Sequence, residues 1–312
     1  MKQRASNNRT LTLEDVERPA LQAMLKSIED LRQGNPSSWL DAVICADMLE
    51  AMRRIPDEMA DLIILDPPYN LTRDFGGSFF KARNDQEYEE YLRSWMHTVC
   101  QKLNPTGSLY LCGDWRCTAA MQRVLSDELT ILNRITWQRE KGRGAKSNWK
   151  NSMEDIWFAV KDPQHYYFNV EAVMMKRRVL APYKVNGEPK DWEEGVDGKY
   201  RLTYPSNFWD DISVPFWSMH ENTDHPTQKP EKLIAKLILA SSKEGDVVFD
   251  PFMGSGTSCV VASKLGRHYC GIEQNEEYCL WALKRLALAK DDAEIQGYAD
   301  GVFWERNTNP HG

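Results

Sequence analysis

The sequence predicts an α/β fold built on a doubly wound, mostly parallel sheet. Short apolar runs typical of buried strands alternate with stretches of helical periodicity, as in a parallel sheet covered by helices. Two of these runs, 62–65 and 247–249, are followed directly by aspartates, Asp66 and Asp250. Because ligands of open α/β sheets bind at the carboxyl ends of the strands, both aspartates are candidate site residues.

Composition narrows the class of protein. The chain has 312 residues, 42% of them hydrophobic, which suits one large domain or a core with an inserted lobe. It has no run of about 18 apolar residues and starts with a polar segment, so we expect neither a membrane span nor a secretory signal. Seven scattered cysteines indicate reduced thiols and a cytoplasmic protein. The closest pair, Cys112 and Cys117, has no second pair or histidine cluster beside it, so no metal site is predicted.

The first part of the chain divides into an arm and half of the sheet. Residues 1–35 are predicted to form a helical arm, whose main helix runs from Pro19 to Leu31. Asp47 follows the first strand and suits either a helix N-cap or a site residue, and the two roles are compatible. In residues 36–137 we predict strands at 42–45, 61–65, 108–112 and 129–137, and helices at 48–55, 87–103 and 118–125.

Residues 138–224 lose this alternation and are rich in glycine, proline, tryptophan and charge. The net charge of −7 argues mildly against a nucleic-acid partner, but clustering of basic residues matters more. Each basic or aromatic side chain here could simply belong to a solvated face or a small core. As a region between two motifs, it is better interpreted as a substrate-recognition lobe. Its candidate phosphate-contacting residues are Arg139, Lys141, Arg143, Lys146, Lys150, Lys176, Arg177 and Arg178.

Residues 225–290 are predicted to complete the sheet, leaving a tail at 291–312 without a clear pattern. The region opens with the motif 225–230, in which a lysine beside a threonine suits a small carboxylate. His225 in that motif could equally be a structural histidine. We predict helices at 231–241, 258–265 and 276–290, and strands at 247–250 and 268–272.

A glycine turn links the strand 247–250 to the next helix. Gly254 and Gly256 allow a ligand to approach the backbone closely. Glu273 ends the next strand about twenty residues later, an offset that suits a ribose diol. A dinucleotide site is the alternative, but the third glycine of its fingerprint would fall on Cys259, which argues against it.

The residues 66–70, with the sequence Asp-Pro-Pro-Tyr-Asn, resemble at 66–69 the hallmark motif of DNA amino-methyltransferases, which implies chemistry on an exocyclic amine. Such a nitrogen is a poor nucleophile because its lone pair is delocalised into the ring. The Asp66 carboxylate and the Pro67 carbonyl could accept the amino hydrogens and hold the nitrogen in line with a methyl donor. Tyr69 could stack on a base that has left the helix. Positioning of this kind is worth ~7–11 kcal/mol when well arranged.

The order of these motifs resembles the permuted β-class of bacterial DNA amino-methyltransferases, as found in restriction–modification systems. The motif 66–69 precedes the glycine turn 252–256, and the motif 225–230 lies just before that turn. The resemblance covers roughly residues 42–290 and implies the fold of S-adenosylmethionine-dependent methyltransferases with an inserted target-recognition region. It assigns 36–137 to the catalytic half, 138–224 to target recognition and 225–290 to cofactor binding.

The resemblance also implies roles for individual residues. Asp66, Pro67, Pro68 and Tyr69 would bind the flipped base, with Asn70 beside them as a DNA contact. Lys229 and Thr227 would lie near the methionine carboxylate of the donor. The residues expected to bind S-adenosylmethionine are Asp47, Asp66, His225, Thr227, Lys229, Asp250, Phe252, Gly254, Ser255, Gly256, Thr257 and Glu273.

The aspartate form of the motif is similar to that of adenine N6 enzymes, so we expect methyl transfer to adenine N6 in duplex DNA. The alternatives are cytosine N4 methylation, RNA methylation and a non-catalytic DNA-binding or donor-binding protein. Many members of the class pair, so a homodimer is also an expectation. A bacterial or phage origin is expected as well.

Overall fold

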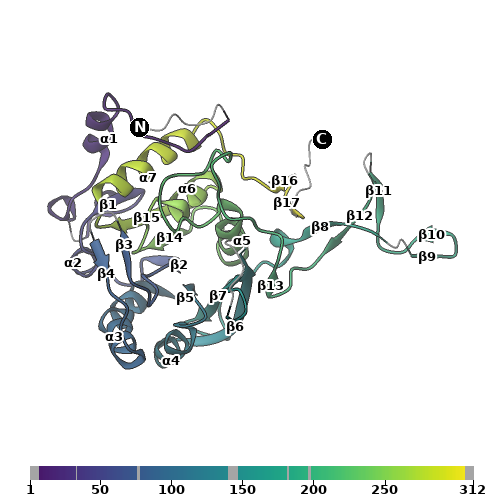
Figure 1. Ribbon diagram of the computed structural model, residues 1–312, viewed down its shortest axis with the longest axis horizontal. Helices are drawn as coiled ribbons and strands as arrows, with labels where there is room; N and C mark the ends of the chain where they lie inside the picture. The colour runs from purple at the N-terminus through teal and green to yellow at the C-terminus, as the bar shows by residue number, and fades with distance from the viewer. Residues whose placement is uncertain are drawn as a thin grey trace.

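The computed structural model describes residues 7–32, 34–75, 78–139, 147–180, 183–195 and 198–305. Its centre is a sheet with helices on both faces, and a smaller, extended lobe projects from one side (Figure 1). This arrangement confirms the predicted fold class. In the described residues, no helix is long and apolar enough to cross a membrane.

The main sheet has eight strands, and its first five are parallel neighbours. The sixth strand in spatial order runs antiparallel to both of its neighbours. In spatial order the strands are β1 (Ala42–Cys45), β15 (His268–Glu273), β14 (Val247–Asp250), β2 (Ala60–Leu65), β5 (Leu103–Gly113), β7 (Met153–Val160), β6 (Thr130–Gln138) and β13 (Phe208–Trp209).

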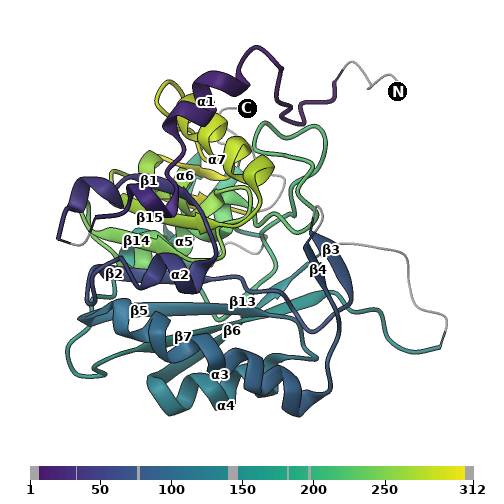
Figure 2. The same cartoon turned by 90° about the vertical axis from the view of Figure 1, so that its left-hand side faces the viewer.

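Helices cover both faces of the sheet, and successive side chains along a strand pack against the helices of opposite faces. In β2, Ile63 and Leu65 pack into the cluster under one set of helices, whereas Leu62 and Ile64 pack into the cluster on the opposite face. One face carries α2 (Met48–Met52), α3 (Asp85–Lys102) and α4 (Thr118–Glu128). The other carries α5 (Glu231–Ser241), α6 (Thr257–Lys264) and α7 (Glu276–Ala289). Figure 2 shows α3 and α4 on one side of the sheet and α6 and α7 on the other.

The N-terminal arm differs from the expected helix. Helix α1 (Arg18–Met24) ends early because Lys26 pairs with Ile44 at the edge of the main sheet. The Lys26 backbone NH donates to Val43 O at 3.0 Å, and its carbonyl accepts from Cys45 N at 2.8 Å. Separate 3-10 turns follow at Ile28–Asp30 and Pro36–Ser38. A backbone engaged in the sheet cannot also continue a helix.

The region 138–224 is not wholly a separate lobe. Strand β7 lies inside it and forms a central part of the main sheet, contrary to the expected boundary. Its buried run, Ile156–Val160, was a signal for a strand, but the described residues between β6 and β7 contain no helix, so the alternation of strands and helices is interrupted there.

The lobe itself is a five-stranded sheet that includes the C-terminal tail. Its order is β11 (Glu193–Gly195), β12 (Gly198–Thr203), β8 (Met175–Arg178), β17 (Val302–Trp304) and β16 (Tyr298–Ala299). A 3-10 turn at Glu171–Val173 leads into it. Two small hairpins complete the fold, β3 (Arg73–Phe75) with β4 (Ser78–Phe80) and β9 (Lys184–Val185) with β10 (Glu188–Pro189).

Candidate active site

A cavity of about 330 Å³ lies at the carboxyl ends of four adjacent strands. Asp47 follows β1, Asp66 follows β2, Phe252 lies after β14 and Glu273 ends β15. Segments far apart in sequence therefore meet at one edge of the sheet, as expected for a parallel α/β fold. Of the residues predicted from the sequence, the cavity is lined by Asp47, Asp66, Pro67, Pro68, Tyr69, His225, Thr227, Phe252, Gly254 and Glu273.

Both carboxylate oxygens of Asp66 have hydrogen-bond partners. The Tyr69 hydroxyl donates to Oδ1 at 2.8 Å, and the Lys229 ammonium donates to Oδ2 at 2.6 Å. Lys229 Nζ also donates to the Tyr69 hydroxyl oxygen at 3.0 Å. Burial, with the charge of Asp66, raises the pKa of Tyr69 well above its usual value. The hydroxyl therefore stays protonated and can keep donating.

Lys229 lies at the catalytic motif, although the sequence suggested a place beside a donor carboxylate. Burial alone would lower its pKa, but the carboxylates of Asp66 and Glu154 outweigh burial and raise the pKa above its usual value. Lys229 lines a small adjoining cavity of about 30 Å³, together with Asp250. Its ammonium is thus a fixed counter-charge for Asp66.

Glu154, at the start of β7, is a site residue that was not predicted from the sequence. This side chain is only 2% exposed, and its Oε2 lies 3.5 Å from Lys229 Nζ and 3.4 Å from the Tyr69 hydroxyl. Its other oxygen accepts a hydrogen bond from Arg139. The pair Glu154-Asp155 directly before a buried apolar run was the one available signal, because charged residues are rarely so buried without partners.

The turn after β2 is held in place from outside the cavity. The Tyr88 hydroxyl on α3 donates to the Pro68 carbonyl at 3.1 Å. Asn70, predicted as a DNA contact, instead closes the following loop. Its amide nitrogen donates to Arg83 O at 2.8 Å, and its oxygen accepts from Arg83 N at 2.7 Å.

The glycine turn brings backbone groups to Glu273. Gly254 has a φ of +55°, and its NH donates to Glu273 Oε2 at 3.1 Å. A Cβ at Gly254 would lie 3.0 Å from His225 Nε2, so the absence of a side chain keeps this wall open. The second carboxylate oxygen of Glu273 accepts from Asn275 N at 2.8 Å. Burial raises the pKa of Glu273.

The rest of the turn supports the packing of helices. A Cβ at Gly256, whose φ is +80°, would lie 2.4 Å from the Cβ of Ala282 on α7. Arg285 donates to the Ser255 carbonyl and the Thr257 hydroxyl, each at 2.9 Å. Gly256, Ser255 and Thr257 therefore do not line the main cavity, and the two polar residues are engaged with α7.

His225 is an uncharged part of the cavity wall. Its ring packs edge-on against Tyr278, with 4.5 Å between ring centroids. Burial lowers the pKa of His225 to about 4, so the imidazole is neutral at physiological pH. Asp47 combines the two roles that were left open, because its carboxylate caps α2 at Leu49 N (2.9 Å) and it also lines the cavity.

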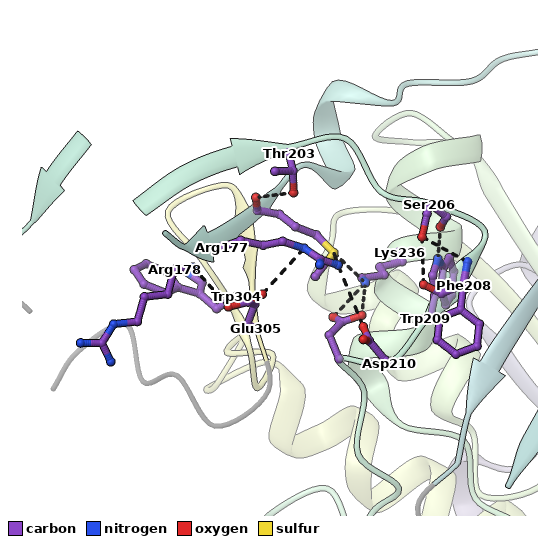
Figure 3. Close-up of polar contacts among 12 residues, drawn as sticks. Arg177, Arg178, Thr203, Ser206, Phe208, Trp209, Asp210, Lys236, Trp304 and Glu305 are labelled. Carbon is purple, nitrogen blue, oxygen red and sulfur yellow. Dashed lines mark hydrogen bonds and ion pairs between the residues drawn. The ribbon is translucent and has the colours of Figure 1, made fainter. Parts of the chain in front are cut away.

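Among the described basic residues that were predicted to contact DNA, Arg139 lies beside the site, where it binds Glu154, whereas those on β8 lie in the lobe. Lys141, Arg143 and Lys146 lie outside the described residues, and Lys150 is exposed. Lys176, Arg177 and Arg178 lie on β8 in the lobe. Figure 3 shows the Arg177 side chain directed at Glu305, and Arg177 Nε lies 3.8 Å from Glu305 Oε1. Lys236 of α5 reaches the lobe near this ion pair.

Comparisons with known proteins agree with this geometry. Residues 60–284 match the N6/N4 family described as DNA methylase. The chain is 32% identical over 258 residues to the type II methyltransferase M.HpaI of Haemophilus parainfluenzae, covering 82% of this chain and 76% of that protein. It is 34% identical over 272 residues to the DNA adenine methyltransferase YhdJ of Escherichia coli strain K12, covering 85% and 88%.

A solved structure of M1.HpyAVI in complex with SAM supports the fold. It superposes with a TM-score of 0.55 at 24% identity, covering 78% of this chain and 98% of that chain. The family match extends from β2 to α7 and so includes the strand-end aspartates and the glycine turn. The chain therefore belongs to the N6/N4 DNA methylase family.

Proposed function

We propose that the protein transfers a methyl group from S-adenosylmethionine to the N6 amine of adenine in duplex DNA. The observation that carries this proposal is the position of the Asp66 carboxylate and Tyr69 in the same cavity as Glu273 and Phe252. The relative named as a DNA adenine methyltransferase, 34% identical, supports adenine as the target. The aspartate form of the motif supports the same base.

The cavity residues fit S-adenosylmethionine. Glu273 presents a carboxylate at a strand end, which suits ribose hydroxyls, and Phe252 and Tyr278 offer aromatic walls for an adenine ring. Gly254 leaves room beside His225, where a side chain would intrude. The cavity volume lies within the roughly 300–1,000 Å³ of small-molecule sites. When bound, the cofactor supplies an electrophilic methyl group on a sulfonium, which leaves as a neutral thioether.

Asp66 and its neighbours would make the amine a better nucleophile. The Asp66 carboxylate and the Pro67 carbonyl accept the two amino hydrogens, so the nitrogen lone pair turns out of the ring plane. Lys229 donates to Asp66 Oδ2 at 2.6 Å and balances the charge of the carboxylate. The amine that gains the methyl group would have to lose one proton, and the Asp66 carboxylate in the same cavity would be placed to accept it. The chain needs no covalent intermediate for this direct transfer.

Tyr69 would supply a stacking surface for the extruded base. Moving a base out of the duplex costs a few kcal/mol, and base–aromatic stacking returns about 1–3 kcal/mol of it. Together with the hydrogen bonds at Asp66, this contact positions the amine.

The test is to incubate the protein with methyl-labelled S-adenosylmethionine and unmethylated genomic DNA, in parallel with Asp66→Ala. The DNA is then digested and the labelled nucleoside identified. The expected result is label on N6-methyladenine, which is absent with the variant, while the variant still binds the donor. Equal loss of donor binding and turnover in a folded Asp66→Ala would contradict the role of Asp66.

Cytosine N4 methylation is the second candidate, because the matching family covers both amines. Label on N4-methylcytosine in the same digest would correct the target base while keeping the cofactor and the site. The homodimer that the class implies stays a prediction, and sedimentation of the purified protein would test it.

A further inference from the structure

The hydroxyl of Tyr69 lies between two carboxylates. It is 2.8 Å from Asp66 Oδ1 and 3.4 Å from Glu154 Oε2. Its oxygen accepts a hydrogen bond from Lys229 at 3.0 Å, so its own hydrogen remains for one of the two acidic acceptors. In the structure that acceptor is Asp66, the shorter contact.

Glu154 is held rigidly at its distance from Tyr69. It extends from β7, where it lies opposite Trp137 of β6, and it is only 2% exposed. Arg139 binds one of its carboxylate oxygens, and the other faces Lys229 at 3.5 Å. Two carboxylates and two cations thus form one charge-balanced cluster beside the Tyr69 hydroxyl, in which Glu154 and Lys229 are buried. Such clusters keep their geometry because loss of any member leaves a buried charge without a partner.

The observed hydrogen bonds weaken Asp66 as an acceptor for the target amine. Each carboxylate oxygen can accept two hydrogen bonds, but Oδ1 already accepts from Tyr69 and Oδ2 from Lys229, so the amine would share an oxygen that is already engaged. The contact with the Lys229 ammonium is charge-assisted and only 2.6 Å long, so it is the harder one to replace. The Tyr69 hydroxyl is the partner that can leave, because a second carboxylate is already in reach.

We propose that Glu154 is a positioning residue, which takes the Tyr69 hydrogen bond from Asp66 when the target amine arrives. This exchange replaces one anionic acceptor with another, and it frees Asp66 Oδ1 for the amine. The inference rests on the proposed function, since it concerns the acceptor that the methylated amine requires. Glu154 acts through Tyr69 and does not itself contact the base.

The substitution Glu154→Gln tests this role. Arg139 and Lys229 are both donors and face different oxygens of Glu154. The single amide oxygen is expected to face Arg139, whose contact is the closer one, which turns the NH₂ group toward Tyr69. The Tyr69 hydrogen bond then stays on Asp66. We expect kcat to fall roughly tenfold, the effect of about one misplaced hydrogen bond, while KM for DNA and for the donor changes much less.

The decisive measurement repeats the substitution in a Tyr69→Phe background, which lacks the competing hydroxyl. There, Glu154→Gln is expected to change kcat less than about twofold, because no hydrogen bond remains to be transferred. If Glu154 were merely structural, Glu154→Gln would lower kcat in the Tyr69→Phe background as much as in the wild-type protein. That result would overturn the proposal. Unchanged kcat for Glu154→Gln alone would overturn it too.

A second variant covers the case in which Glu154→Gln fails to fold. Glu154→Asp keeps the negative charge that balances Arg139 and Lys229, but it withdraws the carboxylate from Tyr69 by one methylene. It should show the same loss of kcat and the same dependence on the Tyr69 hydroxyl. If the wild-type protein methylates no DNA, the proposed function and this inference both fail. If it is active and the two substitutions are additive, only this inference fails.

Discussion

Replacing Asp211 with asparagine should destabilise the protein far more than replacing its main partner, Lys236. Asp211 lies at the junction of α5 with the lobe, and it is 5% exposed. Lys236, on α5, donates to both of its carboxylate oxygens at 2.9 Å. Lys232 forms a further ion pair with Asp211 at 2.8 Å. One buried carboxylate therefore serves two buried ammonium groups.

The expected magnitudes follow from this two-to-one pairing. Asp211→Asn removes the carboxylate that both Lys232 and Lys236 contact, and breaking a buried ion pair in this way costs about 3–5 kcal/mol. Lys236→Met leaves Asp211 paired with Lys232 and removes an ammonium that burial disfavours. Burial lowers the pKa of Lys236 to about 8 even with Asp211 beside it. We therefore expect Lys236→Met to cost less than about 2 kcal/mol.

Thermal unfolding of the two variants beside the wild-type protein is the assay. At roughly 2 °C per kcal/mol for a chain of this size, Asp211→Asn should lower Tm by about 6–10 °C and Lys236→Met by less than about 4 °C. The decrease in Tm that Asp211→Asn causes relative to wild type should also be smaller at pH 9 than at pH 6. A lysine whose folded pKa is lowered destabilises the fold as pH falls through that pKa, and loss of Asp211 lowers the pKa further.

The ordering of the two variants is the critical result. If Lys236→Met lowers Tm as much as Asp211→Asn, the ammonium groups are not balanced by Asp211, and the reasoning fails. Urea unfolding gives an independent value of the free energy of unfolding and a check on cooperativity.

Three further predictions concern the site and its support. Burial raises the pKa of Asp250 to about 7, so the stability that its protonated form contributes is present below pH 4 and is lost as pH rises through 7. Asp250→Asn should remove that loss, so the Tm of the variant relative to wild type should increase between pH 5 and pH 8. Gly256→Ala should cost about 1–3 kcal/mol in urea unfolding because its Cβ would meet Ala282 at 2.4 Å, and an unchanged midpoint would contradict this packing. Tyr88→Phe removes the donor to the Pro68 carbonyl and should cost about 1 kcal/mol, with a several-fold lower kcat and unaltered donor KM in steady-state kinetics.

The sequence by itself determined the parallel part of the sheet and the edge at which the site lies. Apolar runs such as 62–65 and 247–249 are local signals, and the strands they predicted are present. Because parallel strands end on the same edge, Asp66 and Glu273 had to approach one another once both strands were recognised. The order of the motifs indicated the family because each motif is a short, contiguous segment that can be recognised in the sequence alone.

Only the tertiary structure decided which charged groups meet. Lys229 pairs with Asp66, 163 residues away in the chain, a contact that the sequence did not indicate. Its expected place beside a donor carboxylate stays a prediction. Glu154 had no recognisable motif, because its importance comes from Lys229 and Arg139 on other segments. Strand periodicity indicates which side chains are buried, but ion pairs depend on distances of a few ångströms between distant segments. Those distances are set when the sheet and its helices pack together.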